Sequence, residues 1–162
     1  MHHIQVFTDG SVNTQLKVGY AAYLIVTDQN GSIDQLKNSV KIKRFENTSS
    51  TKLELQGLLW SLQEVISLNS QSDVLITIYT DSQNIISLPE RRVALEQNKY
   101  LSSNKKRLNN YELYQDFYRL TAILQCELEK VVGHQVSSKK EHVDRVFALV
   151  DKASRRALRE EF

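Results

Sequence analysis

Apolar residues recur with two different periods along this chain, and the change of period divides it into strands and helices. Alternation with a period of two, or a short β-prone apolar run, is typical of a strand. The predicted strands cover residues 3–9, 18–27, a stretch within 33–45, 74–79 and 127–132. Turn residues at 29–32 separate the second strand from the third, so the chain opens with a predicted three-stranded meander.

Helical spacing of apolar residues predicts the other elements. The clearest helix carries the apolar residues Leu53, Leu58, Leu59, Leu62, Val65 and Ile66. One of the hydroxyl residues at 49–51 is its candidate N-cap. A short helix over 82–88, stopped by Pro89, and helices over 111–124 and 139–161 complete the order βββ-α-β-α-α-β-α. This order favours an α/β fold, with a single mixed five-stranded sheet flanked by helices.

The composition is that of one globular domain covering residues 1–162. Hydrophobic residues make up 41% and charged residues 25%, and the net charge of +2 is so small that attraction to nucleic acid must come from local patches. The single Cys126 excludes an internal disulfide and fits a reducing cytoplasm. We find no signal peptide and no apolar run long enough to span a bilayer, and we expect a cytoplasmic monomer without a membrane partner.

Four carboxylates occupy positions that favour chemistry. Asp9 and Asp81 each follow an apolar run in the pattern Thr-Asp-small residue, and we expect each to end its strand. Glu54 lies in the first turn of a predicted helix among apolar neighbours, where an unpaired charge is costly. Asp151 lies in the last predicted helix. Singly, each has an ordinary explanation as a turn, a dipole complement or a solvated residue, so the combination carries the argument.

The two strand-end aspartates predict a metal site. If strand 74–79 pairs in parallel with strand 3–9, Asp9 and Asp81 lie side by side. Two close carboxylates cannot both stay ionised cheaply, and a divalent cation resolves their repulsion. Oxygen ligands favour Mg²⁺ or Mn²⁺. Two such ions about 3.5–4 Å apart are the usual machinery for cleaving a phosphodiester.

These residues resemble the motifs of type 1 ribonuclease H. FTDGS at 7–11, LEL around Glu54, YTDSQ at 79–83 and VGH at 132–134 match that family's signatures in order and spacing. The first and third motifs are fairly specific, whereas the other two are weak alone. The resemblance covers essentially the whole chain and implies the ribonuclease H-like fold.

The resemblance implies an endonuclease that hydrolyses the RNA strand of RNA–DNA hybrids with two Mg²⁺ ions, for which Mn²⁺ can substitute. Asp9 would bridge both ions, and Glu54 and Asp81 would hold the ion on the leaving-group side. Asp151 would help to hold the ion that activates water, and His134 would assist turnover or product release.

The resemblance also implies substrate contacts. Main-chain groups at Gly10 and Ser11, together with Glu54 and Gln83, would contact the 2′-hydroxyls or minor groove of the RNA strand. Gly10 would let a nucleic-acid backbone approach closely. Ser49 keeps a hydroxyl where the family uses one near a DNA phosphate. Residues 50–51, Ser-Thr, replace the paired asparagines often found there, which weakens contacts to the hybrid.

The fourth carboxylate has two candidates. Asp144 lies closer to the family's common spacing from His134. Asp151, however, is followed three and six positions later by small residues, as in the family's final helix, whereas Phe147 follows Asp144. We predict Asp151.

Cations exceed anions between residues 89 and 111. On composition alone this segment is a solvated surface, but in ribonucleases H it falls where many members carry a basic protrusion that grips the hybrid. Phosphate neutralisation there would make binding salt-dependent. The candidate phosphate-binding residues are Arg91, Arg92, Lys105, Lys106 and Arg107.

Three functions follow from these patterns. The favoured one is a Mg²⁺-dependent endoribonuclease acting on RNA–DNA hybrids. The second is another nuclease of the same fold, such as a resolvase or a DNA-directed nuclease, which fold analogy does not exclude. The third is a catalytically inactive hybrid-binding module, and the presence of all four carboxylates argues against it.

Overall fold

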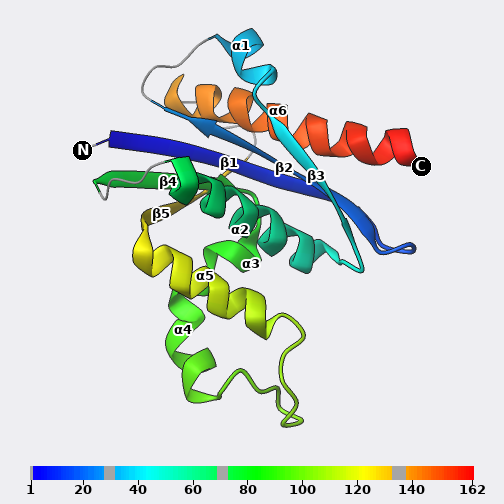
Figure 1. Cartoon of the computed structure of the whole chain (residues 1–162), viewed down its shortest axis with the longest axis vertical. Coiled ribbons are helices and arrows are strands. Elements are labelled where there is room, and N and C mark those ends of the chain that lie inside the picture. The colour runs from blue at the N-terminus through cyan, green and yellow to red at the C-terminus, as the bar shows by residue number, and fades with distance from the viewer. Residues whose placement is uncertain (1, 28–31, 69–72, 133–137) are drawn as a thin grey trace.

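The computed structural model describes residues 2–27, 32–68, 73–132 and 138–162 (Figure 1). Its helices and strands are, in chain order, β1 (His2–Asn13), β2 (Val18–Val26), α1 (Ile33–Lys37), β3 (Lys41–Glu46), α2 (Ser50–Leu68), β4 (Val74–Thr80), α3 (Gln83–Ile86), α4 (Leu88–Gln97), α5 (Tyr111–Ile123), β5 (Gln125–Lys130) and α6 (Ser138–Glu161). No helix within the described ranges is long and apolar enough to cross a membrane.

The strands form one mixed five-stranded sheet in the order β3-β2-β1-β4-β5. The first three strands are antiparallel, whereas β4 pairs in parallel with both β1 and β5. The predicted parallel pairing of the first and fourth strands is therefore confirmed, as is the mixed five-stranded sheet. Helix α2 makes the crossover that this parallel pairing requires.

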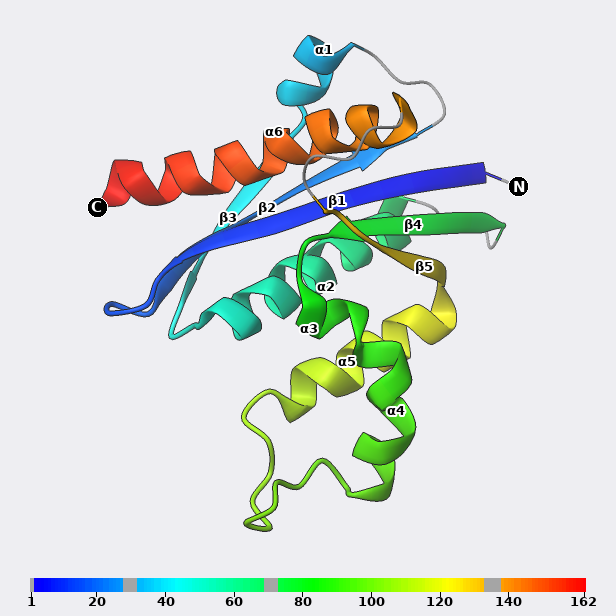
Figure 2. The same cartoon turned by 180° about the vertical axis from the view of Figure 1, so that it is seen from behind.

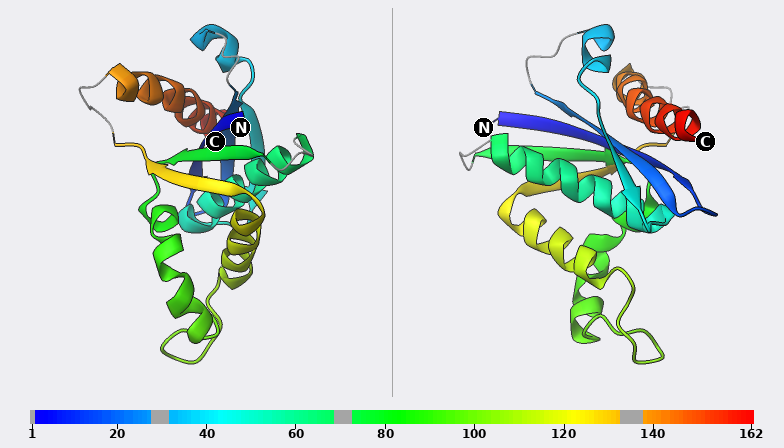
Figure 3. Two further views of the ribbon diagram at one scale, coloured as in Figure 1. Left: turned by 90° about the vertical axis from the view of Figure 1, so that its left-hand side faces the viewer. Right: turned by 45° about the vertical axis from the view of Figure 1, so that its right-hand side comes forward.

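Helices cover both faces of the sheet. Helix α6 packs on β1 and β2, while α2 packs on the same two strands from the opposite side and is backed by α5. The side view in Figure 3 shows these three layers, with α1 beyond α6. Helix α4 and the segment 98–110 project from the α5 side of the molecule, far from α1, in both Figure 1 and the reverse view of Figure 2.

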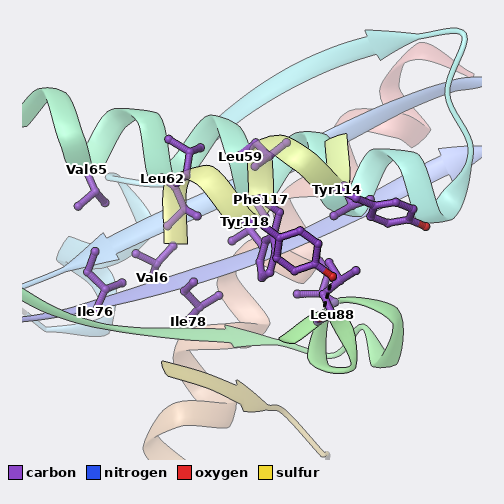
Figure 4. Packing of buried hydrophobic residues seen from close by; sticks show 14 of the residues in the cluster. Val6, Leu59, Leu62, Val65, Ile76, Ile78, Leu88, Tyr114, Phe117 and Tyr118 are labelled. Carbon is purple, nitrogen blue, oxygen red and sulfur yellow. Dashed lines mark hydrogen bonds between the residues drawn. The ribbon is translucent and has the colours of Figure 1, made fainter. Parts of the chain in front are cut away.

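Alternation along β1 divides the core into two clusters. Ile4 and Val6 face α2, where they join the large cluster whose centre is drawn in Figure 4. Phe7 faces α6 and packs with Val150 of that helix. The same alternation places Asp9 and Ser11 on the α6 face and Gly10 on the α2 face. The face that a side chain of β1 occupies therefore decides which helix it can meet.

The first strand is longer than predicted. It continues through Asp9 to Asn13, and Asp9 and Gly10 pair with Ala22 and Ala21 of β2. The described pairing of β1 with β4, by contrast, ends at Phe7. Asp9 therefore lies inside a strand, at the point where one of its two neighbouring strands stops, and the turn interpretation of Asp9-Gly10 is wrong.

An extra helix separates the second and third strands. Helix α1 begins after Ser32, which forms a capping box with Gln35, and the third strand occupies only the end of its predicted range and extends one residue beyond it. The prediction of an uninterrupted three-stranded meander is therefore wrong. The Ser-x-x-Gln pattern at 32–35 is the sequence signal that indicates this helix.

Pro89 begins a helix as well as ending one. The short helix α3 stops at Ile86, and α4 starts at Leu88 with the proline in its first turn, where the missing N–H costs nothing. The prediction of one helix over 82–88 thus covers only the first part of a two-helix unit. The fifth strand also begins and ends two residues earlier than predicted.

Three glycines let α2 lie close to the sheet. A Cβ atom on Gly10 or Gly19 would come within 3.0 or 2.6 Å of the Leu53 Cδ2 atom, and one on Gly57 would come within 2.8 Å of the Ala21 Cβ atom. All three residues lie at the contact between α2 and the first two strands. This close approach fixes the distance between the sheet and the first turns of α2, which carry Glu54.

We predict that Gly57→Ala destabilises the protein although alanine is the better helix former. The rigid Ala21 methyl leaves no space for the new carbon. Overpacking costs roughly 1–3 kcal/mol, whereas the helix-propensity gain is about 1 kcal/mol, so a net loss of about 1 kcal/mol is expected. Urea denaturation measures it, with Gln63→Ala on the exposed side of α2 as the control. A gain of stability would contradict the close packing of α2.

Candidate active site

Asp9 and Asp81 are brought together by the register of β1 and β4. Phe7 lies opposite Tyr79, and the two rings stack with centroids 4.7 Å apart. Asp9 and Asp81 each follow two residues later, so they project from the same side of the sheet as this stack. The two stacked rings form an apolar surface next to the two carboxylates.

Helix α6 brings Asp151 to the same place. Val150 and Ser154 are fully buried against the sheet, and the Ser154 Oγ atom lies 3.2 Å from the Ser11 Oγ atom of β1. The Asp151 side chain is hydrogen-bonded to that of Asp9. The short Ser154 side chain keeps the helix close enough for this contact, as the sequence pattern predicted.

Asp144 lies seven residues before Asp151 on α6, about 10 Å along the helix axis. Phe147, one turn after Asp144, is buried in the cluster between the sheet and α6. Within the described part of the chain, no hydrogen bond or ion pair links Asp144 to Asp9 or Asp81. The structure therefore gathers Asp151, and not Asp144, with the two strand aspartates.

Glu54 reaches the site from the opposite face of the sheet. It lies one turn into α2, and its carboxylate accepts hydrogen bonds from Ser82 (2.5 Å) and Ser50 (3.3 Å). Ser82 directly follows Asp81, so the first of these bonds attaches Glu54 to the end of β4. Neither serine was predicted to have this role.

The proximity of the three aspartates shifts their pKa values. Burial, the negative charge of Asp81 and the hydrogen bond to Asp151 raise the pKa of Asp9 to about 8, against a smaller opposing effect of the Gly10 N–H. Loss of hydration and the charge of Asp151 also raise the pKa of Asp81, although solvent reaches its side chain. Burial acts to raise the pKa of Asp151 too, but its hydrogen bonds with Arg155 and Asp9 outweigh that effect and lower it.

Arg155 is the internal counterion of this cluster. Its guanidinium binds both carboxylate oxygens of Asp151, with the Nε atom 2.9 Å from Oδ1, and it interacts electrostatically with Asp9 and Asp81. This role was not predicted from the sequence. The i, i+4 spacing of Asp151 and Arg155 on one helix face was the available signal.

The donors fit a hard divalent cation. All are carboxylate oxygens, and their mutual repulsion, visible in the raised pKa of Asp9, is the conflict that such a cation relieves. Among the described side chains, no three His, Cys, Asp or Glu residues already form a coordination sphere. Asp151 is instead bound by Arg155, and Glu54 by the two serines.

Comparison with known proteins identifies the family. A family model described as RNase H matches residues 1–152. The chain belongs to the ribonuclease H family.

Individual relatives agree with this assignment. A ribonuclease H of Caldicellulosiruptor saccharolyticus (strain ATCC 43494 / DSM 8903 / Tp8T 6331) is 24% identical over 151 residues, which cover 90% of this chain and 94% of the relative. The solution structure of the PFV RNase H domain matches with a TM-score of 0.65 at 13% identity, over 94% of each chain. The structure of LC11-RNase H1 in complex with an RNA/DNA hybrid matches with a TM-score of 0.60 at 14% identity, over 96% of this chain and 99% of that one.

The resemblance to ribonuclease H is thereby confirmed, together with the fold it implied. Family membership makes the chain a nuclease that acts on the RNA strand of RNA–DNA hybrids. Ribonucleases H use divalent metal ions, which agrees with the all-oxygen character of the three gathered aspartates and of Glu54.

The expected substrate residues of this ribonuclease H have structural partners of their own. Gly10 faces Leu53, so packing of α2 is a sufficient reason for a glycine there. Ser11 contacts Ser154, the Ser49 side chain accepts a hydrogen bond from the N–H of Lys52 at the start of α2 (3.2 Å), and Gln83 accepts one from Lys130 (2.8 Å). His134 lies outside the described residues.

The basic segment of the ribonuclease H is partly a helix. Three of its arginines lie over tyrosine rings of α5, at centroid distances of 5.5 Å (Arg91 and Tyr114), 5.3 Å (Arg92 and Tyr118) and 4.7 Å (Arg107 and Tyr111). Arg92 also pairs with Glu96. Lys105 and Lys106 are exposed in the turn between Leu101 and Arg107, which pair as a β-bridge within the projecting segment 98–110.

We predict that Asp9 makes the stability of the metal-free enzyme fall with rising pH. The pKa of Asp9 is about 8 when folded and near its ordinary value of 3.8 when unfolded. Its contribution to stability is therefore complete below about pH 4 and is lost as the pH rises through 8. Melting in EDTA between about pH 5 and pH 9 should show a steeper decline for the wild type than for Asp9→Asn. Asp144→Asn is the matched control. Parallel stability profiles for the wild type and Asp9→Asn would show that the pKa of Asp9 is not raised in the folded protein.

Proposed function

We propose that this ribonuclease H cleaves the RNA strand by a two-metal-ion mechanism at Asp9, Glu54, Asp81 and Asp151. The observation that supports this most directly is the convergence of Asp9, Asp81 and Asp151, from three separate segments, into one crowded cluster. Like charges are not gathered in this way for stability, because each raises the cost of ionising the next. Perturbed carboxylates that cluster at a sheet edge are typical of functional sites.

Each carboxylate has a position suited to its role. Asp9 interacts with both Asp81 and Asp151, which supports its assignment as a ligand that would hold divalent ions together with either of them. Glu54 accepts a hydrogen bond from Ser82, the residue after Asp81, which supports assigning these two carboxylates together to an ion on the leaving-group side. Asp151, on the other side of Asp9, is assigned to the water side, and His134 to product release. Divalent ions bound there, Mg²⁺ or Mn²⁺, would activate water and stabilise the leaving oxygen.

Arg155 occupies one lone pair on each oxygen of Asp151, so a metal ion bound to this carboxylate would compete with the guanidinium. The pair is on the surface, and Arg155 is 63% exposed, so its release costs little. Asp9 would give up its proton on metal binding, because a nearby cation favours the ionised carboxylate. The metal-free structure therefore keeps the site partly neutralised, by a proton and a guanidinium that a cation can displace.

Recognition of the substrate combines two surfaces. The 2′-hydroxyl distinguishes RNA from DNA, and main-chain groups at Gly10 and Ser11 with Gln83 lie beside the carboxylates. Helix α4 and the segment 98–110 project away from the sheet (Figure 1), which supports assigning their cations to phosphates of the same duplex. We assign Ser49, at the start of α2, to a DNA phosphate.

The experiment that tests this function is cleavage of matched RNA–DNA, RNA–RNA and DNA–DNA duplexes with Mg²⁺ or Mn²⁺. We expect cleavage of the RNA strand of the hybrid alone, and its loss with Asp81→Asn, which keeps the shape of the side chain. Comparable cleavage of DNA–DNA would indicate a DNA-directed nuclease instead. Tight hybrid binding without cleavage in either metal would indicate an inactive binding module.

We predict that Asp151→Asn loses most activity, whereas Asp144→Asn changes it by less than about tenfold, or 1.4 kcal/mol of barrier. Only Asp151 contacts Asp9 and approaches Asp81. Both variants remove one charge from the same helix, so each controls for the other. Single-turnover cleavage of the hybrid at saturating enzyme measures both, and the reverse ranking would assign the fourth carboxylate to Asp144.

We predict that Lys105→Gln with Lys106→Gln lowers the salt dependence of hybrid binding. Each lost phosphate contact reduces the slope of log K against log salt by roughly 0.9. The control is a double variant of equal charge, Lys37→Gln with Lys41→Gln, near α1 at the opposite end of the molecule. Binding is measured by fluorescence anisotropy with an uncleaved hybrid in Ca²⁺. An equal change of slope in the two double variants would show that the projecting segment does not bind phosphate.

A further inference from the structure

Ser82 connects the end of β4 to the carboxylate of Glu54. It directly follows Asp81, it is only 6% exposed, and its Oγ atom donates a hydrogen bond to the Oε2 atom of Glu54 at 2.5 Å. The same Oγ atom accepts a hydrogen bond from the N–H of Ile85 at 3.3 Å, which caps α3. Its main-chain N–H is bound in turn by the Thr80 Oγ1 atom at 3.1 Å.

These contacts fix the direction of the hydroxyl hydrogen. A serine hydroxyl has one hydrogen to donate and two lone pairs to accept with. The cap on α3 uses a lone pair, so the hydrogen remains for Glu54. Because the backbone of Ser82 is itself held by Thr80, the donor has a fixed position and direction. Ser82 is therefore a rigid donor rather than a rotating surface hydroxyl.

Glu54 needs such a donor more than the aspartates do. Its helix lies on the face of the sheet opposite α6, and its longer side chain has one more rotatable bond than aspartate. The other hydrogen bond that its carboxylate accepts from the described residues, from the Oγ atom of Ser50, is long at 3.3 Å and exposed. Without Ser82, the described part of the chain would hold the carboxylate on one side only, by a weak bond within its own helix.

We infer that Ser82 is a positioning residue that holds Glu54 in place to bind a divalent cation next to Asp81. The inference rests on the proposed function, since it assigns Glu54 to the metal site. Ser82 acts through Glu54 and not on the substrate. A carboxylate oxygen that accepts one hydrogen bond keeps a lone pair for a cation. Partners of metal ligands that orient them in this way typically change metal affinity by 10- to 100-fold when removed.

The test is Mn²⁺ binding by the metal-free protein, followed by the electron paramagnetic resonance signal of free Mn²⁺. We expect Ser82→Ala and Ser82→Gly to weaken binding about tenfold, at the low end of the range for such partners. Ser82→Thr keeps the hydroxyl and should stay within about twofold of the wild type. Glycine is nearly as good an N-cap as serine, so Ser82→Gly remains informative if Ser82→Ala unfolds.

Two controls separate this role from simple capping of α3. Ser87→Ala removes a side-chain hydrogen bond to Asn84 at the other end of the same helix, without touching Glu54, and should leave Mn²⁺ binding unchanged. In a Glu54→Gln background, Ser82→Gly should have less than about a twofold effect, because the group through which it acts is gone. An equal loss in both backgrounds, or wild-type binding by Ser82→Gly, would overturn the inference.

Hybrid cleavage by the wild type distinguishes failure of the proposed function from failure of the role assigned to Ser82. If the wild type cleaves the hybrid in Mn²⁺ but the Ser82 variants bind Mn²⁺ normally, the proposed function stands and the role of Ser82 is refuted. If the wild type neither binds Mn²⁺ nor cleaves the hybrid, the proposed function fails, and the role of Ser82 fails with it.

Discussion

The parallel pairing of β1 with β4 is the constraint on which the rest of the structure depends. It sets Phe7 opposite Tyr79 and so places Asp9 and Asp81 on the same face of the sheet. A shift by one residue would move one aspartate to the α2 face and leave the other on the α6 face. Because both strands are central and buried on both faces, their apolar side chains hold the register firmly. The geometry of the candidate active site is thus determined by packing of the neighbouring strand residues rather than by contacts among the carboxylates.

The two helices beside this strand pair approach it closely, each by means of small residues. Glycines at 10, 19 and 57 bring α2 near the sheet, and Ser11 and Ser154 do the same for α6. Carboxylates have short side chains, so a helix at ordinary distance could not deliver one to a group on the sheet. Small residues at the contacts therefore serve the site indirectly, because they set the distance from which Glu54 and Asp151 act.

Much of this arrangement follows from the sequence, because the strong patterns are also the ones that packing obeys. The periodicity from Leu53 to Val65 indicated α2, and the repeated Thr-Asp motif indicated the paired aspartates. The continuation of β1 beyond Asp9 was missed because its polar residues look like a turn until the partner strand is known. Helix α1 is short, with little periodicity. The role of Ser82 depends on a contact between distant segments that forms only after folding, whereas that of Arg155 was visible in its i, i+4 spacing from Asp151.

The arginines stacked on α5 have a consequence for the speed and cost of substrate capture. Tyr111, Tyr114 and Tyr118 lie on one face of that helix, and each has a guanidinium over its ring. A free arginine side chain loses up to about 2 kcal/mol of rotamer entropy when it is immobilised. Here part of that ordering has taken place before any duplex arrives. The tyrosines thus preorganise these arginines, so that in the proposed mode of binding a phosphate would meet charges already in position instead of having to order them itself.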